Sequence, residues 1–375
     1  MIPVSKPCIG DRELAAIDPV LKSGWLGLGP TVFNFEEALK KYLGAKNVIA
    51  VNTGTSALHI ALDAVGVGPG DEVIVPSMTF VASIQPILLL GATPVFCEVQ
   101  KENLLLDIED VRKKITPKTK AIIPVHYCGN SCDMDSLLEL AKQHQFWVIE
   151  DAAHAFGSDY KGRKIGSFGH LTCFSFDPIK VITTGEGGAI SLIDDVLAEE
   201  IRRKRILGID KDTWHRYRGE RTWFYEVTTT GYRYHMSSIN AAIGIEQLKQ
   251  IEPFITRRRE ICSRYDSAFS RLHAIHTLKI DWSSAAPFTY ILRVPGNRDA
   301  FMKALAEQGI GTGVHYIPNH TQPLFEKYAI GHPLPITTLL GEEIVTIPLY
   351  VGLTDGEVDQ IIKAVCTFDS STKEV

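Results

Sequence analysis

The sequence predicts an α/β fold, a mostly parallel sheet with helices on both faces, joined to a smaller C-terminal α+β domain. Between residues 47 and 192, short apolar runs of strand length alternate with segments whose apolar residues recur at helical spacing. Such alternation is typical of parallel strands connected by helices. At 375 residues the chain is long for a single core. We therefore expect a large domain at residues 1–250 and a small domain at residues 251–375.

The expected elements follow in chain order. Apolar runs predict strands of the large domain at residues 47–51, 71–75, 93–99, 121–125, 146–149, 171–176 and 189–192. Helical periodicity predicts helices at residues 11–22, 33–42, 57–65, 84–90, 136–144, 198–206 and 239–250. In the small domain we expect helices at residues 254–272, 300–308 and 355–365 and strands at residues 290–294 and 311–316.

Composition and charge exclude several classes of protein. The hydrophobic content of 45% and charged content of 22% are ordinary for globular proteins, and a net charge of −5 gives no reason to expect nucleic acid or an anionic membrane as partner. The N-terminus lacks the apolar run of a secretory signal. The seven cysteines show neither a disulfide framework nor zinc spacing, although Cys128 and Cys132 are close together. We expect a cytoplasmic protein without a metal.

Basic and aromatic residues alternate at residues 214–223. Such interleaving is found in proteins that bind single-stranded nucleic acid. Because the chain as a whole is acidic, we interpret this segment as an interface loop instead.

Lys180 stands between two apolar strand patterns, just after Pro178 and before a glycine cluster at residues 185–188. A tight connection between buried strands would lower the pKa of its amine and make it nucleophilic. Lysines of this kind form Schiff bases with carbonyl cofactors such as pyridoxal phosphate. A surface lysine beside a glycine-rich turn fits the local pattern equally well.

Polar residues follow several of the predicted strands. The turn at residues 52–56 precedes a helix, so its backbone N–H groups and hydroxyls can hold a phosphate, or Thr55 or Ser56 can simply cap the helix. Asp151 follows a buried strand, where a carboxylate needs a cation such as a protonated pyridine nitrogen, a salt bridge or a helix cap. Ligands of parallel sheets bind beyond the carboxyl ends of the strands, so these residues can converge there.

Short motifs occur in a fixed order along nearly the whole chain. They stand at residues 23–24, 29–30, 53–59, 76–80, 125–127, 133–135, 150–155, 174–176, 180, 185–188, 240–244 and 247–248. Together they resemble the DegT/DnrJ/StrS family of sugar aminotransferases, within the fold-type I pyridoxal phosphate enzymes. The segments around Asp151, Lys180 and residues 311–315 are similar to those of enzymes that aminate UDP-linked 4-keto sugars.

The resemblance implies a role for each matching residue. Lys180 would be the catalytic lysine that carries the Schiff base, and Asp151 would keep the pyridine nitrogen protonated. Phe80 would stack on the cofactor ring, although a core aromatic fits the sequence as well. His154 would lie near the ring and its 3-hydroxyl side, although a hydrogen-bonded core histidine fits too.

The phosphate and substrate contacts follow from the same resemblance. The residues that would hold the phosphate are Gly54, Thr55, Ser56 and Ser175. The family commonly has Asn-Tyr-Arg-Met after Gly231-Tyr232, and this chain has Arg233, Tyr234, His235 and Met236 instead. An arginine at position 233 can still bind the phosphate of the neighbouring subunit's cofactor. The expected substrate contacts are Trp25, for which packing is the alternative, His235, His315 and Tyr316.

The implied activity is a ping-pong transfer of an amino group from glutamate to a nucleotide-linked keto sugar, with pyridoxal phosphate as cofactor. We expect amination at C4 of a UDP- or dTDP-sugar, in polysaccharide or lipopolysaccharide biosynthesis, by a homodimer with shared active sites. Amination at C3 and a non-catalytic, cofactor-binding regulator are the alternatives. The deoxygenating dehydratases of the family carry His at the position of Lys180, which argues against that activity.

Overall fold

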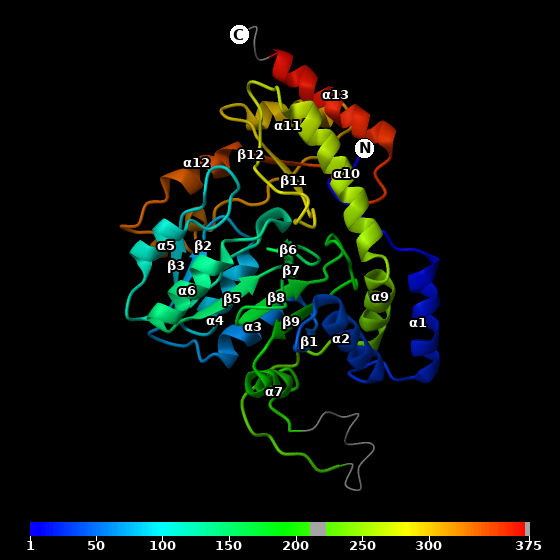
Figure 1. The fold of residues 1–375 in the computed structure, drawn as a ribbon, viewed down its shortest axis with the longest axis vertical. Coiled ribbons are helices and arrows are strands. Elements are labelled where there is room, and N and C mark those ends of the chain that lie inside the picture. Colours follow the sequence, from blue (N-terminus) through cyan, green and yellow to red (C-terminus); the bar gives the residue numbers. More distant parts are fainter. Residues whose placement is uncertain (211–222, 372–375) are drawn as a thin grey trace.

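A large sheet of seven strands forms the centre of the molecule (Figure 1). The structure is a computed structural model that describes residues 1–210 and 223–371. The strand order is β1-β9-β8-β5-β4-β2-β3. The bounds are β1 Asn47–Val51, β2 Glu72–Pro76, β3 Thr93–Cys97, β4 Thr119–Ile122, β5 Trp147–Asp151, β8 Leu171–Ser175 and β9 Gly188–Leu192. All neighbours pair in parallel except β9, which runs antiparallel to β8 and β1. The mostly parallel α/β sheet predicted from the sequence is therefore confirmed.

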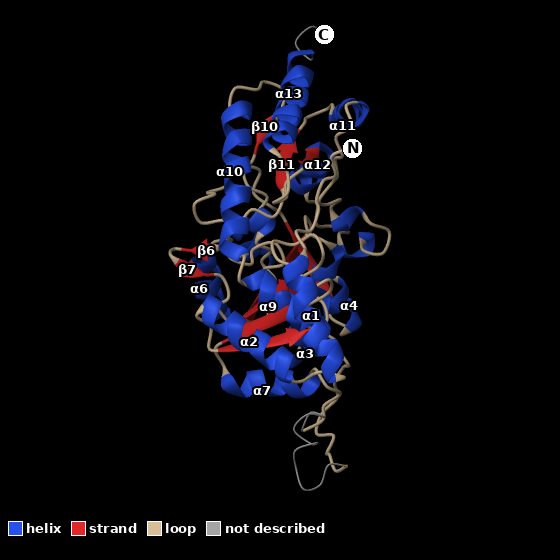
Figure 2. Cartoon of the chain, turned by 90° about the vertical axis from the view of Figure 1, so that its right-hand side faces the viewer, coloured by secondary structure: helices blue, strands red, loops and turns tan. Residues whose placement is uncertain are grey.

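Helices cover both faces of this sheet (Figure 2). They are α1 Asp11–Ser23, α2 Pro30–Leu43, α3 Gly54–Ala64, α4 Gln85–Leu89, α5 Ile108–Lys114, α6 Met134–His144, α7 Asp195–Lys204 and α9 Ser238–Leu248, with short 3-10 helices η1 Val81–Ser83 and η2 Tyr127–Gly129 and a small hairpin of β6 Asp159–Tyr160 and β7 Arg163–Lys164. Alternate residues of a strand point to opposite faces. In β1, Ile49 and Val51 accordingly pack with α3 and α7, whereas Val48 and Ala50 pack with α2.

A second, antiparallel sheet has the order β10-β11-β12. Its strands are β10 His276–Thr277, β11 Tyr290–Arg293 and β12 Ile344–Ile347, and the elements around it are α10 Ile251–Phe269, α11 Arg298–Glu307, η3 Asn319–Thr321, η4 Glu326–Tyr328, α12 Pro335–Glu343 and α13 Asp355–Ser371. The backbone N–H of Ile2 donates to Gly309, and that of Leu349 donates to Val4. The start of the chain thus borders the C-terminal sheet. A domain boundary near residue 250, between α9 and α10, stays our proposal.

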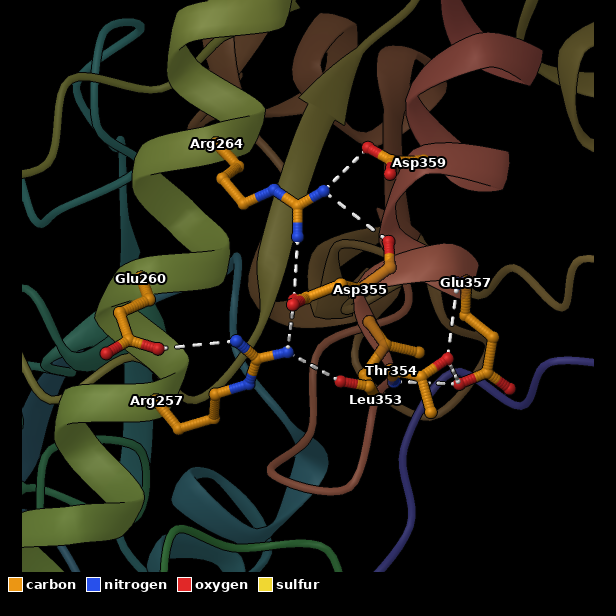
Figure 3. A network of polar contacts seen from close by, with 8 residues as sticks. All are labelled: Arg257, Glu260, Arg264, Leu353, Thr354, Asp355, Glu357 and Asp359. Atoms are coloured by element: carbon orange, nitrogen blue, oxygen red, sulfur yellow. Dashed lines mark hydrogen bonds and ion pairs between the residues drawn. The ribbon is translucent and has the colours of Figure 1, made fainter.

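Helices α10 and α13 are joined by a network of exposed charges (Figure 3). Asp355 accepts hydrogen bonds of 2.8 Å from both Arg257 and Arg264, and Arg264 also binds Asp359 at 2.6 Å. Ion pairs this exposed contribute little to stability, because water and salt screen them. The buried core between these helices and the second sheet is the main source of their stability.

The predictions failed mainly in the C-terminal part. Residues 311–316 do not form a strand, and only Gly313 makes a bridge, to Thr346. Helix α12 and strand β12 were not predicted, because they follow one another directly and each contains only a short apolar run. Most of the basic and aromatic segment at residues 214–223 lies outside the described residues. Within the described chain, no helix is both long and apolar enough to cross a bilayer.

Candidate active site

A cavity of about 290 Å³ lies at the carboxyl ends of the parallel strands, where residues 315 and 316 of the C-terminal part reach the large sheet. The residues that line it follow β1, β2, β5 and β8 in the chain, the edge at which parallel sheets bind ligands. The predicted site residues found in its wall are Gly54, Thr55, Phe80, Asp151, His154, Ser175, Lys180, His315 and Tyr316. The convergence suggested by the strand ends is thus present in the fold.

Lys180 lies on the connection between β8 and β9 and is half-buried, with its side chain in the wall of the cavity. Its Nζ lies 4.2 Å from the centroid of the Phe288 ring. No hydrogen bond or ion pair to this amine occurs within the described residues. Burial lowers the pKa of Lys180 to about 8, and the nearby carboxylates of Asp177 and Asp151 only partly oppose this shift. A considerable fraction of this amine is therefore neutral and nucleophilic near neutral pH.

Asp151 ends strand β5 and is 5% exposed. Its Oδ2 accepts a hydrogen bond of 2.6 Å from the hydroxyl of Ser83, and its Oδ1 accepts one of 3.1 Å from the backbone N–H of Ala153. The strand end is fixed as well, since Asp151 N–H donates to the carbonyl of Pro124. A buried carboxylate with no cationic partner among these contacts is suited to a cationic group bound in the cavity.

His154 contributes a neutral imidazole to the wall. Its Nε2 shares a hydrogen bond of 3.0 Å with the hydroxyl of Tyr316, and its ring centroid lies 4.2 Å from that of Phe288. Burial, and secondly the charges of Lys180 and His315, hold the pKa of His154 well below its usual value. Within the described residues its buried Nδ1 has no hydrogen-bond partner. His154 is therefore not a fully hydrogen-bonded core residue, although Nδ1 itself is buried.

The N-terminus of α3 forms one end of the cavity. The hydroxyl of Thr53, the N-cap residue, accepts from the backbone N–H of Ser56 at 3.0 Å and is also 2.8 Å from the Ser56 hydroxyl. Ser56 is thus engaged in capping and does not line the cavity. The first N–H groups of a helix have no intrahelical acceptor. Those of Gly54 and Thr55, with the Ser175 side chain packed against Gly54, suit an anion at this end.

Phe80 stands at the mouth of the cavity. Its side chain is 54% exposed, and its ring centroid lies 5.4 Å from that of Tyr316. An aromatic residue of the core would be buried, so the core interpretation of Phe80 is wrong. Phe80 and Tyr316 instead provide aromatic walls for a flat ligand.

Besides Ser56, three predicted site residues do not line the cavity of their own chain. The indole N–H of Trp25 donates to the carbonyl of Leu28 at 2.9 Å, and its ring covers Gly29, as the packing alternative expects. Arg233 is exposed and forms a bridge with Ile206, while His235 forms one with Val51. The described cavity wall therefore does not include Trp25, Arg233 or His235.

The sequence reasoning missed several residues of the site. Phe288, beneath Lys180 and His154, comes from a C-terminal loop whose position no local pattern indicates. Ser83 could have been found from the sequence, because its hydroxyl stands four residues after that of Thr79, just past the end of a predicted strand.

Cys128 and Cys132 are both buried, and burial raises the pKa of Cys128 to about 12. The thiol of Cys128 therefore stays protonated and is no candidate nucleophile.

A parallel α/β sheet with a nucleophilic lysine, a buried acid and an anion site at one edge defines the class of fold-type I pyridoxal phosphate enzymes. More particularly, the chain belongs to the DegT/DnrJ/EryC1/StrS aminotransferase family, whose sequence profile matches residues 7–366. The resemblance seen in the motifs is thereby confirmed.

The comparisons with individual proteins agree with this family. The chain is 40% identical over 374 residues to the spore coat polysaccharide biosynthesis protein SpsC of Bacillus subtilis, covering 97% of this chain and 96% of SpsC. The putative sugar aminotransferase Spr1654 of Streptococcus pneumoniae, solved in its PMP-form, superimposes with a TM-score of 0.93 at 32% identity, over 99% of this chain and 100% of Spr1654. PseC of Helicobacter pylori, an aminotransferase in the biosynthesis of pseudoaminic acid, gives 0.91 at 29% identity over 99% of both chains.

Proposed function

We propose that the chain is a pyridoxal-phosphate-dependent aminotransferase that moves an amino group from glutamate to a nucleotide-linked keto sugar. The observation that carries the proposal is that Lys180, whose pKa is lowered to about 8, and the buried Asp151 line the same cavity. An amine with a strongly shifted pKa in a pocket marks a candidate site of chemistry. Family membership and the PLP- and PMP-forms of Spr1654 support the same cofactor and the same class of substrate.

The residues present fit the cofactor. Gly54, Thr55 and Ser175 would hold its phosphate at the N-terminus of α3, and Asp151 would bind its ring nitrogen as a cationic N–H. Phe80 would cover the ring, and the imidazole of His154 would form part of the wall around it. When bound, pyridoxal phosphate supplies an aldehyde for amines and a ring that accepts electrons.

Lys180 has two tasks in the proposed reaction. Its neutral amine would hold the cofactor at the aldehyde carbon. When free, the same amine would act as the base that accepts a proton from the α-carbon of glutamate. A pKa of about 8 suits both tasks, because a proton carrier works best near the ambient pH.

The described wall of the cavity holds few cations for the two proposed substrates. Of the described residues lining the cavity, Lys180 alone is a lysine or an arginine, whereas the diphosphate of a nucleotide sugar and the two carboxylates of glutamate are negatively charged. Residues 223–235 include the exposed Trp223, Phe224 and Val227. In Figure 1 the beginning of this segment extends beyond α7. We infer a homodimer in which this segment carries Arg233 and His235, and α1 with its following loop carries Trp25, to the partner's cavity.

The sugar remains a proposal within this class. Similarity to enzymes of 4-keto sugars favours C4 of a UDP- or dTDP-sugar, with polysaccharide biosynthesis as the role, as the name of SpsC suggests. The test incubates the purified holoenzyme with glutamate, and then with a panel of 3-keto and 4-keto nucleotide sugars. We expect 2-oxoglutarate and an aminated sugar nucleotide, both identified by mass spectrometry.

Each outcome of this test is informative. A protein that binds pyridoxal phosphate but releases no 2-oxoglutarate would be the non-catalytic regulator. Release of 2-oxoglutarate with amination of 3-keto substrates alone would correct the position of the new amino group. The predicted cytoplasmic location stays a prediction, which cell fractionation can test.

A further inference from the structure

Two buried hydroxyl groups are linked by hydrogen bonds to the carboxylate of Asp151, and one of them belongs to Thr79, which also lines the cavity. The hydroxyl of Ser83, a fully buried residue of η1, is 2.6 Å from Asp151 Oδ2. The hydroxyl of Thr79, which is 2% exposed, lies 2.8 Å from that of Ser83. Thr79, Ser83 and Asp151 thus form a continuous chain of hydrogen bonds ending at the acid of the cavity.

The direction of this chain follows from a count of hydrogens. An ionised carboxylate only accepts, so Ser83 must use its single hydroxyl hydrogen on Asp151. The hydrogen between the two hydroxyls must then come from Thr79, and each bond polarises the next. With Ala153 N–H on Oδ1, both oxygens of Asp151 have one fixed donor. Each oxygen keeps a lone pair for a group in the cavity.

The C-terminal part of the molecule fixes the position of Thr79, where this chain of hydrogen bonds begins. The side-chain amide of Asn319 donates to the carbonyl of Thr79 at 2.6 Å and to that of Ser77 at 3.1 Å. His320 N–H donates to the Ser77 hydroxyl at 2.9 Å. The turn that carries Thr79 and Phe80 is therefore held against the segment that carries Tyr316.

We propose that Ser83 and Thr79 are positioning residues that fix the orientation of the Asp151 carboxylate toward the ring nitrogen of the cofactor. The inference rests on the proposed function. A carboxylate with a preset orientation accepts the ring N–H without rearranging, whereas a freely rotating one does so less well. In metal sites, removing the outer hydrogen-bond partners of the ligands typically costs about 10- to 100-fold in affinity or activity, and we expect an effect of the same order here.

The test compares Ser83→Ala, Thr79→Val and Thr79→Ser as holoenzymes. Val has nearly the volume of Thr without the hydroxyl, whereas Ser keeps the hydroxyl. The readouts are the NMR resonance of the cofactor's ring nitrogen, labelled with a heavy isotope, and kcat for the glutamate half-reaction. We expect Ser83→Ala to shift the resonance toward the unprotonated form and to lower kcat about 10- to 100-fold with an unchanged KM. Thr79→Val should act in the same direction to a smaller extent, and Thr79→Ser should match the wild type.

The matched control is Ser191→Ala. Ser191 is also buried, and its hydroxyl donates to the carbonyl of Gly166 at 2.7 Å, outside the cavity. It should lose stability but keep the resonance. Wild-type values in folded Ser83→Ala would overturn the inference while leaving the function intact. Failure of the wild type itself to bind the cofactor covalently would instead refute the proposed function.

Discussion

Charged groups meet at two places in this molecule, and the two places differ in whether the charges are paired. On the surface between α10 and α13, Arg257 and Arg264 share Asp355, whose side chain is 72% exposed (Figure 3). In the cavity, the amine of Lys180 has no ion-pair partner within the described chain, and the pKa of that amine is lowered by burial.

The difference explains why a group in the cavity can be reactive and the paired groups on the surface are not. Paired charges in water contribute a small free energy that salt screens, and their protonation states are ordinary. A buried and unpaired amine is unstable in its charged form and therefore becomes a base and a nucleophile. The comparison predicts that changes in the cavity alter activity strongly, and that changes on the α10–α13 surface alter it hardly at all.

The largest effect is expected from Lys180→Ala. The variant loses both the covalent link to the cofactor and the group that moves the proton. Loss of the proton transfer alone should lower turnover about 10²- to 10⁴-fold, and loss of the covalent link should lower it further. Steady-state 2-oxoglutarate release and the absorbance of the bound cofactor measure the two losses. Lys164→Ala is the control, because Lys164 is paired with Asp159 and lies outside the cavity wall. Steady-state turnover retained by Lys180→Ala would refute the assignment of the catalytic lysine.

Asp151→Asn should have the next largest effect. Asn keeps the size of Asp and can still accept from Ser83, but it has no charge to hold a protonated ring nitrogen. We expect kcat to fall roughly 10²- to 10³-fold, as when one preorganised electrostatic partner is removed. The cofactor should still bind through Lys180, which absorbance can verify. A variant with unchanged kcat would show that this acid does not act on the ring.

The sequence predicted the seven-stranded sheet well because its strands are buried and the helices that cover it are amphipathic. The run before Asp151 and the runs on either side of Lys180 were strands as expected, and most of the predicted site residues line one cavity. Strand ends locate a site in such a fold, since parallel strands share one carboxyl edge.

The parts that were not predicted depend on contacts between distant segments. Phe288 packs beneath Lys180 only because the C-terminal part folds onto the large sheet, and no local pattern marks that residue. Ser56 fits a phosphate loop in sequence, but in the structure its backbone N–H donates to the hydroxyl of Thr53, the N-cap of α3. Whether Trp25, Arg233 and His235 reach an active site depends on a second chain, which a single sequence does not describe.

The lowered pKa of Lys180 also predicts a pH-dependent stability. In the protein freed of cofactor, Lys180 titrates at about 8 when folded and near 10.4 when unfolded. The unfolded state binds more protons between these values, so the free energy of unfolding rises with pH through this window. Below pH 8 the cost of burying the charge is complete. Lys180→Met should therefore be more stable than the wild type at pH 7, by about 3 kcal/mol.

Denaturant unfolding of both proteins at pH 7 and pH 10 measures this effect. The advantage of Lys180→Met should shrink at the higher pH, because the wild-type amine is then neutral in the folded state. An equal difference at both pH values would mean that the amine titrates normally, and the contrast between the cavity and the surface network would lose its basis.

The smallest effect is expected from Asp355→Asn on the α10–α13 surface. The pKa of Asp355 is lowered by its hydrogen bond to Arg257 and by the charges of both arginines. A carboxyl group with a lowered folded pKa stabilises the protein above its ordinary pKa of about 3.9, and this contribution is lost as the pH falls through the folded pKa. At pH 7 and low salt we expect Tm to fall by less than about 2 °C. The difference should nearly vanish in high salt, because exposed charges are screened, while kcat stays at the wild-type value. A loss of kcat would show that the surface network supports the cavity, and the two regions would then have to be treated as one.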